Sequence, residues 1–473
     1  MKLKKYLSDI RFWLGFHFLL RLIGITNPPY ESGAWRQVIT AMVAKNMVFG
    51  DFNLLLPKMD YFFMSMETTT GISPMEFPLF NAMGAIVSLV FGWHDWHLRL
   101  VNLVVSTLGI WYFYLLIKKF FSEGMAFFSA FILLQSIWWT YSRKIMPDTF
   151  SISLALISLY YAFEYFDVSS KRKSWWSLML FLVIGTAGML AKIPSSYLFG
   201  LILFPLLDKT ITRSKKMWLI FSSLPFLSMV FWWYFIWSPY LIEKYNNRMF
   251  FMGKGLGEGL NEILAHLYQF SEHFTKFAFS LSGFILCLIA LGFLIKKKDK
   301  LMWQLLILLS GSFGVFILKS GYNFIHHSYY IIPFVPVLSM LAGYGLEQIK
   351  QKKVVLLLLV VFSVDNFFRH QHDLRTPKRD HYRFGVPAII DKYIPKDVLV
   401  AVNGGASPVD MYNLGRRGYS LEEPELTVEN FALLKQRGVG FFVINRHGTK
   451  TELNEKEIFR NEDLIIYQLL PTL

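Results

Sequence analysis

Long apolar runs alternate with short polar stretches along the first 368 residues. A membrane-spanning helix needs about 20 apolar residues, with a lower limit near 17 unless the segment is broken or bent. The pattern therefore predicts eleven transmembrane segments: 11–25, 98–117, 126–141, 150–166, 175–190, 194–207, 217–237, 274–295, 301–318, 329–346 and 354–368.

One further apolar segment, 77–91, is short and lies between Glu76 and the polar sequence GWHDWH. If it crossed the membrane, the later basic clusters would change sides. If it lies on the surface, all the basic clusters fall on one side, which the positive-inside rule makes cytoplasmic. These clusters are 2–5, 118–119, 171–173, 209–216, 296–300 and 350–353. The segment is therefore predicted to be an interfacial helix, anchored by Trp93 and Trp96.

This topology places the N-terminus in the cytoplasm and the loop 26–97 on the outer side. From Arg369 the chain becomes polar, and DVLVAVNGG, GVGFFVIN and DLIIYQLL are typical of strands, with a helix expected in TVENFALLKQRG. We expect two domains: a polytopic α-helical membrane domain, 1–368, and a small extracytoplasmic α/β domain, 369–473.

The composition agrees with a multi-pass membrane protein: 54% of residues are hydrophobic, 17% are charged and the mean hydropathy is +0.39. The net charge of +15 does not indicate nucleic-acid binding, because the basic clusters adjoin the predicted spans. The single cysteine, Cys287, excludes an intrachain disulfide and a cysteine-based metal site. No small-x-small cleavage site precedes Asn27, so the first apolar run is interpreted as an uncleaved span.

Charges at membrane edges are costly and are therefore candidates for function. Carboxylates grouped with cations and histidines at one membrane face suit group transfer from an anionic lipid, because a carboxylate can deprotonate an acceptor hydroxyl while cations stabilise a departing phosphate. Any one of these charges taken singly is better explained as a solvated loop residue or a headgroup anchor, so the group is more informative than its members. The candidate set is Glu31, Arg36, Gln37, Asp60, Glu76, Arg143, Asp148, Lys192, His326, His327 and Tyr330.

Six motifs in order carry a family resemblance: NPPYESGAWRQVITAMVAKN, NLLLPKMD, MEFPLFNAMGAIVSLVFGWHDWHLRL, YSRKIMPDTFSISLALISLYY, GMLAKIPSSYLF and HHSYYIIPFVPVLSMLAGYG. Together they resemble bacterial glycosyltransferases of the C superfold (GT-C), in the group related to protein O-mannosyltransferases and aminoarabinose transferases. The resemblance covers about the first 350 residues. It implies an enzyme of the bacterial cytoplasmic membrane that moves a sugar from a polyprenyl-phosphate donor to a glycan, lipid or protein acceptor on the outer face.

The resemblance also implies roles for individual residues. Glu31 matches the acidic residue that serves as catalytic base, with Glu76 in EFP as the alternative. This chain departs from the family pattern, which more often has Asp at the first position and a polar or acidic residue at the position of Ile39.

Three further positions match polar positions of the family. Lys192 matches a lysine that follows the fifth span, and its alternative role is to extend its charged end to the headgroups. His326 and His327 match a polar stretch near the donor phosphate, and the alternative is an ordinary interfacial pair. The superfold also allows a divalent metal between carboxylate and phosphate, although no ligand spacing requires one.

Two other functions remain open. A flippase or transporter for a lipid-linked saccharide would also need many spans, but its charges should line the membrane midplane, whereas the acidic residues here concentrate in outer loops. A glycan polymerase or ligase would share the outer-face site. The glycine-rich GKGLGEG, 253–259, lacks a preceding strand and is interpreted as a flexible loop rather than a phosphate cradle.

Overall fold

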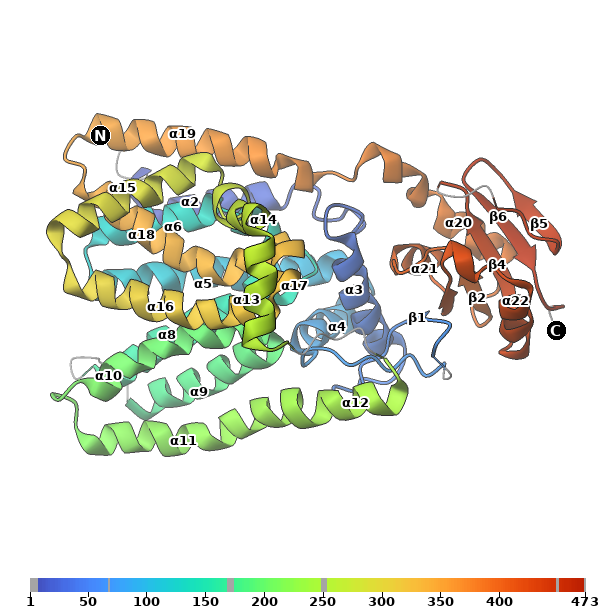
Figure 1. Ribbon diagram of the computed structural model, residues 1–473, viewed down its shortest axis with the longest axis horizontal. Helices are drawn as coiled ribbons and strands as arrows, with labels where there is room; N and C mark the ends of the chain where they lie inside the picture. The colour runs from blue at the N-terminus through green and yellow to red at the C-terminus, as the bar shows by residue number, and fades with distance from the viewer. Residues whose placement is uncertain (1–6, 67–68, 168–173, 248–252, 448–450, 472–473) are drawn as a thin grey trace. The chain divides into compact units, whose positions relative to one another are not determined.

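The structure is a computed structural model that describes residues 7–66, 69–167, 174–247, 253–447 and 451–471 (Figure 1). Two of the predicted basic clusters, 2–5 and 171–173, lie outside the described residues. The chain forms two compact units. Unit 1 comprises Met1–Thr26, Leu98–Trp237 and Phe251–Leu374, and unit 2 comprises Asn27–His97, Ser238–Phe250 and Arg375–Leu473.

Unit 1 is a bundle of helices, and every predicted transmembrane segment overlaps helical structure in it. In its first part the helices are α2 (Ile10–Arg21), α5 (Trp96–Phe120), α6 (Glu123–Gln135), α7 (Trp138–Tyr141), α8 (Pro147–Phe166), α9 (Ser174–Ala191), α10 (Leu203–Leu207) and α11 (Arg213–Trp232). In its second part they are α13 (Leu256–Ala265), α14 (Leu267–Glu272), α15 (Leu281–Lys297), α16 (Lys300–Ser320), α17 (Tyr322–His326), α18 (Val335–Gln348) and α19 (Lys352–His370).

Within the described part of the chain, six helical segments are long and apolar enough to cross a membrane, and a seventh is added if a pair bent by 93° counts as one span. The bent pair is Leu267–Phe277 with Leu281–Lys297, so the predicted span 274–295 contains a sharp bend at its start. The other predicted spans are helices that are shorter, broken or more highly charged. The chain is thus a multi-pass membrane protein, while the count of eleven spans stays a prediction.

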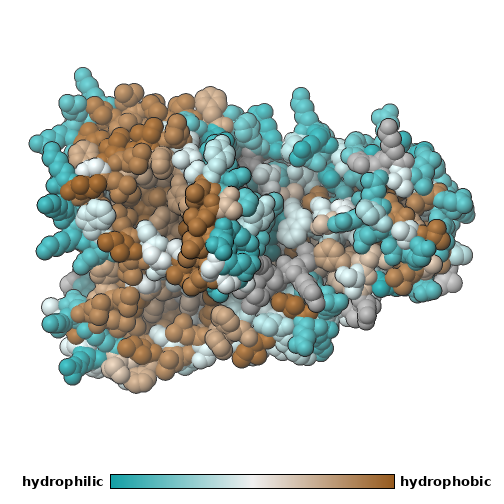
Figure 2. All heavy atoms as spheres, viewed as in Figure 1, coloured by the Kyte–Doolittle hydropathy of each residue, from teal (hydrophilic) through white to brown (hydrophobic). Residues whose placement is uncertain are grey.

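The outer surface of unit 1 is apolar, as contact with lipid requires. Figure 2 shows hydrophobic residues covering much of the visible face of the bundle. Exposed apolar side chains cover much of the surface of α11, among them Leu224 and Phe231, and of α19, among them Leu357 and Val361. The remaining face of α11 packs against α9, and that of α19 packs against α15.

Small residues allow the helices of unit 1 to approach closely, which is a common basis of helix packing in membranes. Gly343 of α18 lies against Ser129 of α6, and Gly345 of the same helix lies against Ala290 of α15. Helix α18 is therefore closely packed against both α6 and α15.

Unit 2 is built from both the first loop and the C-terminal segment, which fold together. It contains α3 (Ala34–Phe49), α4 (Leu79–Phe91), α12 (Ser238–Tyr245), α20 (Val386–Tyr393), α21 (Val409–Leu414) and α22 (Val428–Gln436). Its sheet has the strand order β1-β3-β2-β4-β6-β5, with bounds β1 (Tyr61–Phe62), β2 (Leu399–Val402), β3 (Gly418–Ser420), β4 (Val439–Asn445), β5 (Lys456–Arg460) and β6 (Leu464–Gln468). The first four strands in this order are parallel, and β6 and β5 run antiparallel to their neighbours.

The C-terminal sheet is present as the sequence predicts, with β2, β4 and β6 in the three predicted strand sequences and α22 in the predicted helix. The sequence did not indicate that a strand of the first loop joins this sheet. In β1, Tyr61 pairs with Gly418 and Phe62 pairs with Tyr419. The loop 26–97 and the C-terminal segment are therefore parts of one compact unit.

The glycine-rich segment 253–259 differs from the expected flexible loop. Helix α13 begins within it at Leu256, and Lys254 forms an ion pair with Glu262 at 2.6 Å. Gly259 packs directly against the backbone of Leu318 in α16, so no side chain fits there. Gly259 permits close helix packing, and the expectation of a loop was wrong for the part of the segment that lies in α13.

We predict that Gly343→Ala lowers the apparent Tm of the detergent-solubilised protein. The new Cβ would lie 2.6 Å from the backbone nitrogen and 2.9 Å from the Cα of Ser129, so α6 and α18 must separate. Overpacking of this kind costs about 1–3 kcal/mol. The control is Gly314→Ala in α16, where no atom lies within 4 Å and the Tm should stay equal or rise slightly. Equal Tm values for both variants would contradict the packing described.

Candidate functional site

The residues around Glu31 form a turn that leads from the first helix of unit 1 into α3 of unit 2. The backbone N–H of Tyr30 donates to the carbonyl of Pro28 at 2.8 Å, and Gly33 has a φ of +80° just before α3 begins. A positive φ favours glycine, so Gly33 fixes the start of the helix. Glu31 in this turn and Gln37 in the first turn of α3 are both buried.

Arg36 and Glu76 form a partly buried ion pair in unit 2. The guanidinium Nη2 of Arg36 lies 2.5 Å from the Oε2 of Glu76, and each side chain is less than one-sixth exposed. Helices α3 and α4 pack together near this pair, and Asn81 donates to the carbonyl of Thr40 at 2.7 Å. The structure therefore pairs Arg36 with the second candidate base.

Asp60 has different partners. Its carboxylate accepts from Asn46 Nδ2 at 3.0 Å and lies 4.0 Å from Arg417. Burial raises the pKa of the Asp60 carboxyl, while the hydrogen bond from Asn46 acts in the opposite direction. Asp60 lines a polar cavity of about 1040 Å³ with Lys58 and Arg417, and neither Glu31 nor Glu76 is among the residues that line it.

In unit 1, Asn102 organises the segment that joins α7 to α8. The amide nitrogen of this buried residue in α5 lies 2.9 Å from the carbonyl oxygens of Tyr141 and Lys144 and 3.1 Å from that of Met146. Its oxygen accepts from Thr149 in α8 at 3.0 Å. Asn102 was not among the candidates predicted from the sequence, although a lone amide within an apolar span could have indicated it.

Asp148 and Lys192 form the most deeply buried ion pair between candidate residues. The Nζ of Lys192 lies 2.5 Å from the Oδ1 of Asp148, and the two side chains are 11% and 3% exposed. Asp148 lies in the first turn of α8, where the helix dipole favours a negative charge. Lys192 follows the last residue of α9 and directs its ammonium inward, so it does not extend to the headgroups.

Aromatic rings surround the ammonium of Lys192. Its Nζ lies 5.1 Å from the ring centroid of Tyr329 and 5.8 Å from that of Tyr330. The ring of His327 is 5.2 Å from each of these tyrosine rings. His326 lies beside His327 and stacks on Tyr322. The structure thus brings Lys192, Tyr330 and His327 into one cluster, with His326 at its edge.

Buried cations are more numerous than buried carboxylates in unit 1. Of the described residues of this unit, one buried carboxylate, Asp148, stands against five buried arginine and lysine side chains: Arg21, Arg99, Arg143, Lys144 and Lys192. All five lie at helix ends or in the turns that join helices. Arg21 and Arg99 were not among the candidates predicted from the sequence, because both lie within predicted spans.

Backbone oxygens and aromatic rings hold several of these cations. Arg143 donates to the carbonyl of Ile23 at 2.7 Å, and Arg21 donates to that of Leu134 at 2.5 Å. The guanidinium of Arg21 also lies 5.2 Å from the ring centroid of Trp139. Such neutral partners stabilise a cation without cancelling its charge. These cationic side chains are gathered at one end of the bundle.

Metal binding has no direct support from the side chains. Among the residues described, no group of three or more His, Cys, Asp or Glu side chains is arranged to hold an ion.

The helical bundle and the α/β unit are similar in fold to solved structures of membrane glycosyltransferases. ArnT from Cupriavidus metallidurans is similar in its apo state, with a TM-score of 0.61, 11% identity and 97% of this chain matching 98% of ArnT. The form of ArnT bound to undecaprenyl phosphate is similar with a TM-score of 0.60, 11% identity and the same coverage of both chains. The oligosaccharyltransferase of Archaeoglobus fulgidus, in a complex with zinc and sulfate, gives a TM-score of 0.57 at 11% identity, over 91% of this chain and 67% of the other.

At the level of sequence, the model of the dolichyl-phosphate-mannose-protein mannosyltransferase family matches residues 74–235. No curated protein matches. The resemblance named from the sequence motifs is thereby confirmed.

We predict that Lys192→Ala destabilises the protein strongly, because the Asp148 carboxylate would stay buried without its cation. Removing one partner of a buried pair typically costs about 3–5 kcal/mol. The double variant Lys192→Met/Asp148→Asn removes both charges and should recover most of the lost thermal stability in detergent. If Lys192→Ala alone were as stable as the unaltered protein, the ion pair would contribute little to the stability of the fold.

Proposed function

We propose that this protein is a membrane glycosyltransferase that moves a sugar from a polyprenyl-phosphate donor to an acceptor on the outer face of a bacterial cytoplasmic membrane. The observation that carries the proposal is the group of five buried arginine and lysine side chains at one end of unit 1. Clustered cations of this kind suit a lipid-borne phosphate, because charge-assisted hydrogen bonds to phosphate are strong. The fold shared with ArnT over nearly the whole chain supports the same class of reaction.

An apolar groove supports a lipid-linked donor. Side chains of α2, α6 and α19 line a cavity of about 580 Å³, among them Phe16, Phe131 and Phe367. Trp139 also lines it, and the guanidinium of Arg21 lies over that ring. A polyprenyl chain in the groove would therefore place its phosphate near buried cations, whose charge-assisted hydrogen bonds hold phosphate well.

The orientation follows from the two kinds of positive charge in unit 1. Exposed lysines occur at the C-terminal end of α5, including Lys118, and at the turn between α15 and α16, including Lys297. The buried cations occur at the other ends, including Arg99 near the start of α5 and Lys192 at the end of α9. The positive-inside rule assigns the exposed lysines to the cytoplasm, so the buried cations face outward.

We assign the carboxylate of Glu31 as the general base for the acceptor hydroxyl. Glu76 is the alternative, and it forms an ion pair with Arg36 at 2.5 Å. That pair is better suited to fixing α3 and α4 around the turn that carries Glu31. Lys192, Arg143, His327 and their neighbours are assigned to the donor phosphate. A divalent metal at the phosphate is compatible with this assignment.

A flippase is the principal competing function, and a polymerase or ligase of lipid-linked glycans is the second. The buried carboxylate of unit 1, Asp148, lies in the first turn of its helix rather than at the middle of a span. Alternating access would favour charges at the midplane. The position of Asp148 therefore favours chemistry at the membrane surface.

We predict that Glu31→Gln reduces turnover by about 10²- to 10⁴-fold while donor binding is retained, because the amide keeps the size but loses the basicity. This loss corresponds to roughly 3–5 kcal/mol of barrier. The matched control, Glu31→Asp, keeps a carboxylate and should retain much more activity. Near-normal turnover of Glu31→Gln together with an inactive Glu76→Gln would instead identify Glu76 as the base.

We also predict that the double variant Lys192→Met/Asp148→Asn binds undecaprenyl phosphate at least tenfold more weakly than the unaltered protein. The loss of one charge-assisted contact is worth about 1.5–3 kcal/mol. The variant has the same net charge as the original chain, so a general electrostatic effect is avoided. Unchanged affinity, measured by native mass spectrometry, would mean that Lys192 serves only the structure.

A further inference from the structure

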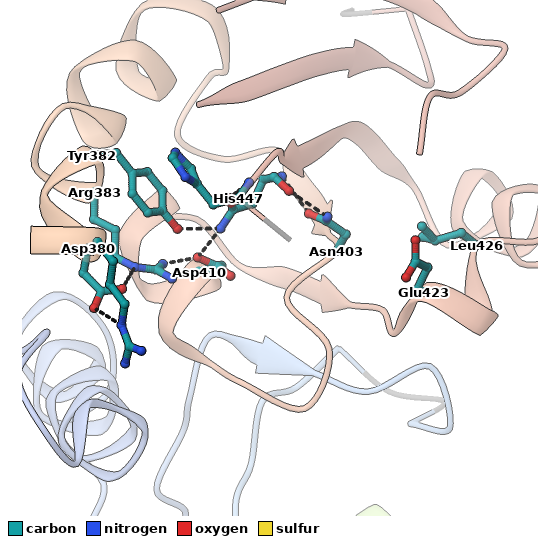
Figure 3. A pocket seen from close by; sticks show the side chains of 10 residues that line it. Asp380, Tyr382, Arg383, Asn403, Asp410, Glu423, Leu426 and His447 are labelled. Atoms are coloured by element: carbon teal, nitrogen blue, oxygen red, sulfur yellow. Dashed lines mark hydrogen bonds and ion pairs between the residues drawn. The ribbon is translucent and has the colours of Figure 1, made fainter. Parts of the chain in front are cut away.

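The C-terminal segment of unit 2 contains a polar pocket that the proposed transfer reaction does not use (Figure 3). Its volume is about 440 Å³. None of the residues assigned to the donor phosphate or to the base lines it. The lining residues are Arg379, Asp380, Tyr382, Arg383, Asn403, Asp410, Glu423, Leu426, Asn445 and His447.

The pocket lies at the point in the sheet where the order of the strands reverses. From β2 the chain passes to β3 on one side, and from β3 it returns to β4 on the other side of β2. Asn403 directly follows β2, and Asn445 is the last residue of β4. The carboxyl ends of parallel strands at such a point form a crevice, which is where open α/β sheets bind ligands.

The polar groups of the pocket are held in place by one another. Asn403 donates to the carbonyl of Asn445 at 3.0 Å and accepts from its backbone N–H at 2.7 Å. The side-chain nitrogen of Asn445 donates to the Tyr382 hydroxyl at 2.7 Å and to Asp410 Oδ1 at 3.1 Å. Arg383 also donates to Asp410 Oδ1. This network, drawn in Figure 3, fixes the side chains before any ligand arrives.

The charges that line the pocket do not suit a phosphate. Three carboxylates, Asp380, Asp410 and Glu423, stand against two arginines, and one of these, Arg383, already pairs with both Asp380 and Asp410. The imidazole of His447 lies 2.7 Å from Asp463. An anion would meet this excess of carboxylates, so a neutral ligand is favoured.

The hydrogen-bonding groups match sugar hydroxyls, each of which both donates and accepts. The carboxylates accept, the guanidinium groups donate, and the phenol of Tyr382 does both. Burial and the charge of Asp410 raise the pKa of Tyr382, so the phenol keeps its proton. Because the oxygen of Tyr382 already accepts from Asn445, its proton is left to donate to a ligand.

A flat surface completes the pocket. The rings of Tyr382 and His447 stack with centroids 3.8 Å apart and an interplanar angle of 22°. The side chain of His447 is 42% exposed, so part of the stacked pair is open to a ligand. The C–H face of a sugar ring can pack against such a surface while its hydroxyls reach the polar groups.

We propose that this pocket binds a neutral saccharide unit of the acceptor. The assignment to the acceptor rests on the proposed glycosyl transfer, whereas saccharide binding itself does not. The pocket would select a glycan acceptor by a sugar remote from the reacting hydroxyl, and binding energy from a remote part of a substrate can improve positioning at the reacting atoms.

The test uses the full-length protein in detergent and saturation-transfer NMR with methyl glycosides of glucose, galactose and mannose and with N-acetylglucosamine. At least one of these sugars should receive saturation, and His447→Ala should weaken its apparent affinity about tenfold or more. Asp410→Asn, which keeps the side-chain shape, should do the same. The control, Asp397→Asn, changes an exposed carboxylate that does not line this pocket and should leave binding unchanged.

Absence of saccharide binding, binding that survives both pocket variants, or binding of inorganic phosphate instead of sugars would overturn the inference. Saccharide binding without any transferase activity would refute the proposed function and leave the pocket as a saccharide site. When transfer is measured, His447→Ala should raise KM for the acceptor and leave KM for the polyprenyl-phosphate donor unchanged. A raised donor KM would assign the sugar to the donor and contradict the proposal.

Discussion

The helical unit buries five arginine and lysine side chains at one end of its bundle against a single buried carboxylate among its described residues, and this arrangement constrains much of what surrounds it. The ion pair of Asp148 with Lys192 neutralises one charge, at 2.5 Å. Carbonyl oxygens and aromatic rings hold others, and Asn102 orders the turn that carries Arg143 and Lys144. Under the proposed function, a donor phosphate bound to this folded arrangement would add to its stability.

Unit 2 gives the long first loop a fixed shape. The loop contributes β1 to the edge of the C-terminal sheet, where Tyr61 and Phe62 pair with β3. Helices α3 and α4 pack together, with Arg36 and Glu76 paired beside them. Since Glu31 lies in the turn before α3, its position depends on this unit. The same unit forms the saccharide pocket, so the proposed base and the proposed acceptor subsite belong to one compact body.

The sequence predicted local features better than distant contacts. Apolar runs located the helices, and alternation located β2, β4 and β6, because these patterns depend on neighbouring residues. The two residues of β1 are too few to show an alternating pattern, and the strand with which they pair, β3, lies more than 350 residues away in the sequence. Arg21 and Arg99 were not selected as candidate site residues, because each lies within an apolar segment that the sequence predicts to be a membrane span. The pairing of Lys192 with Asp148 and of Arg36 with Glu76 also joins distant residues, and periodicity contains no information about it.

The central claim is transfer of a single sugar from a polyprenyl-phosphate carrier. The most direct measurement reconstitutes the purified protein in liposomes with a radiolabelled polyprenyl-phosphate hexose, adds a cell-envelope acceptor fraction and follows the label. We expect that label becomes covalently bound to the acceptor, that free polyprenyl phosphate is released in equal amount, and that a nucleotide sugar does not replace the donor. Passage of intact labelled donor across the bilayer without a new glycosidic bond would instead identify a flippase and refute glycosyl transfer.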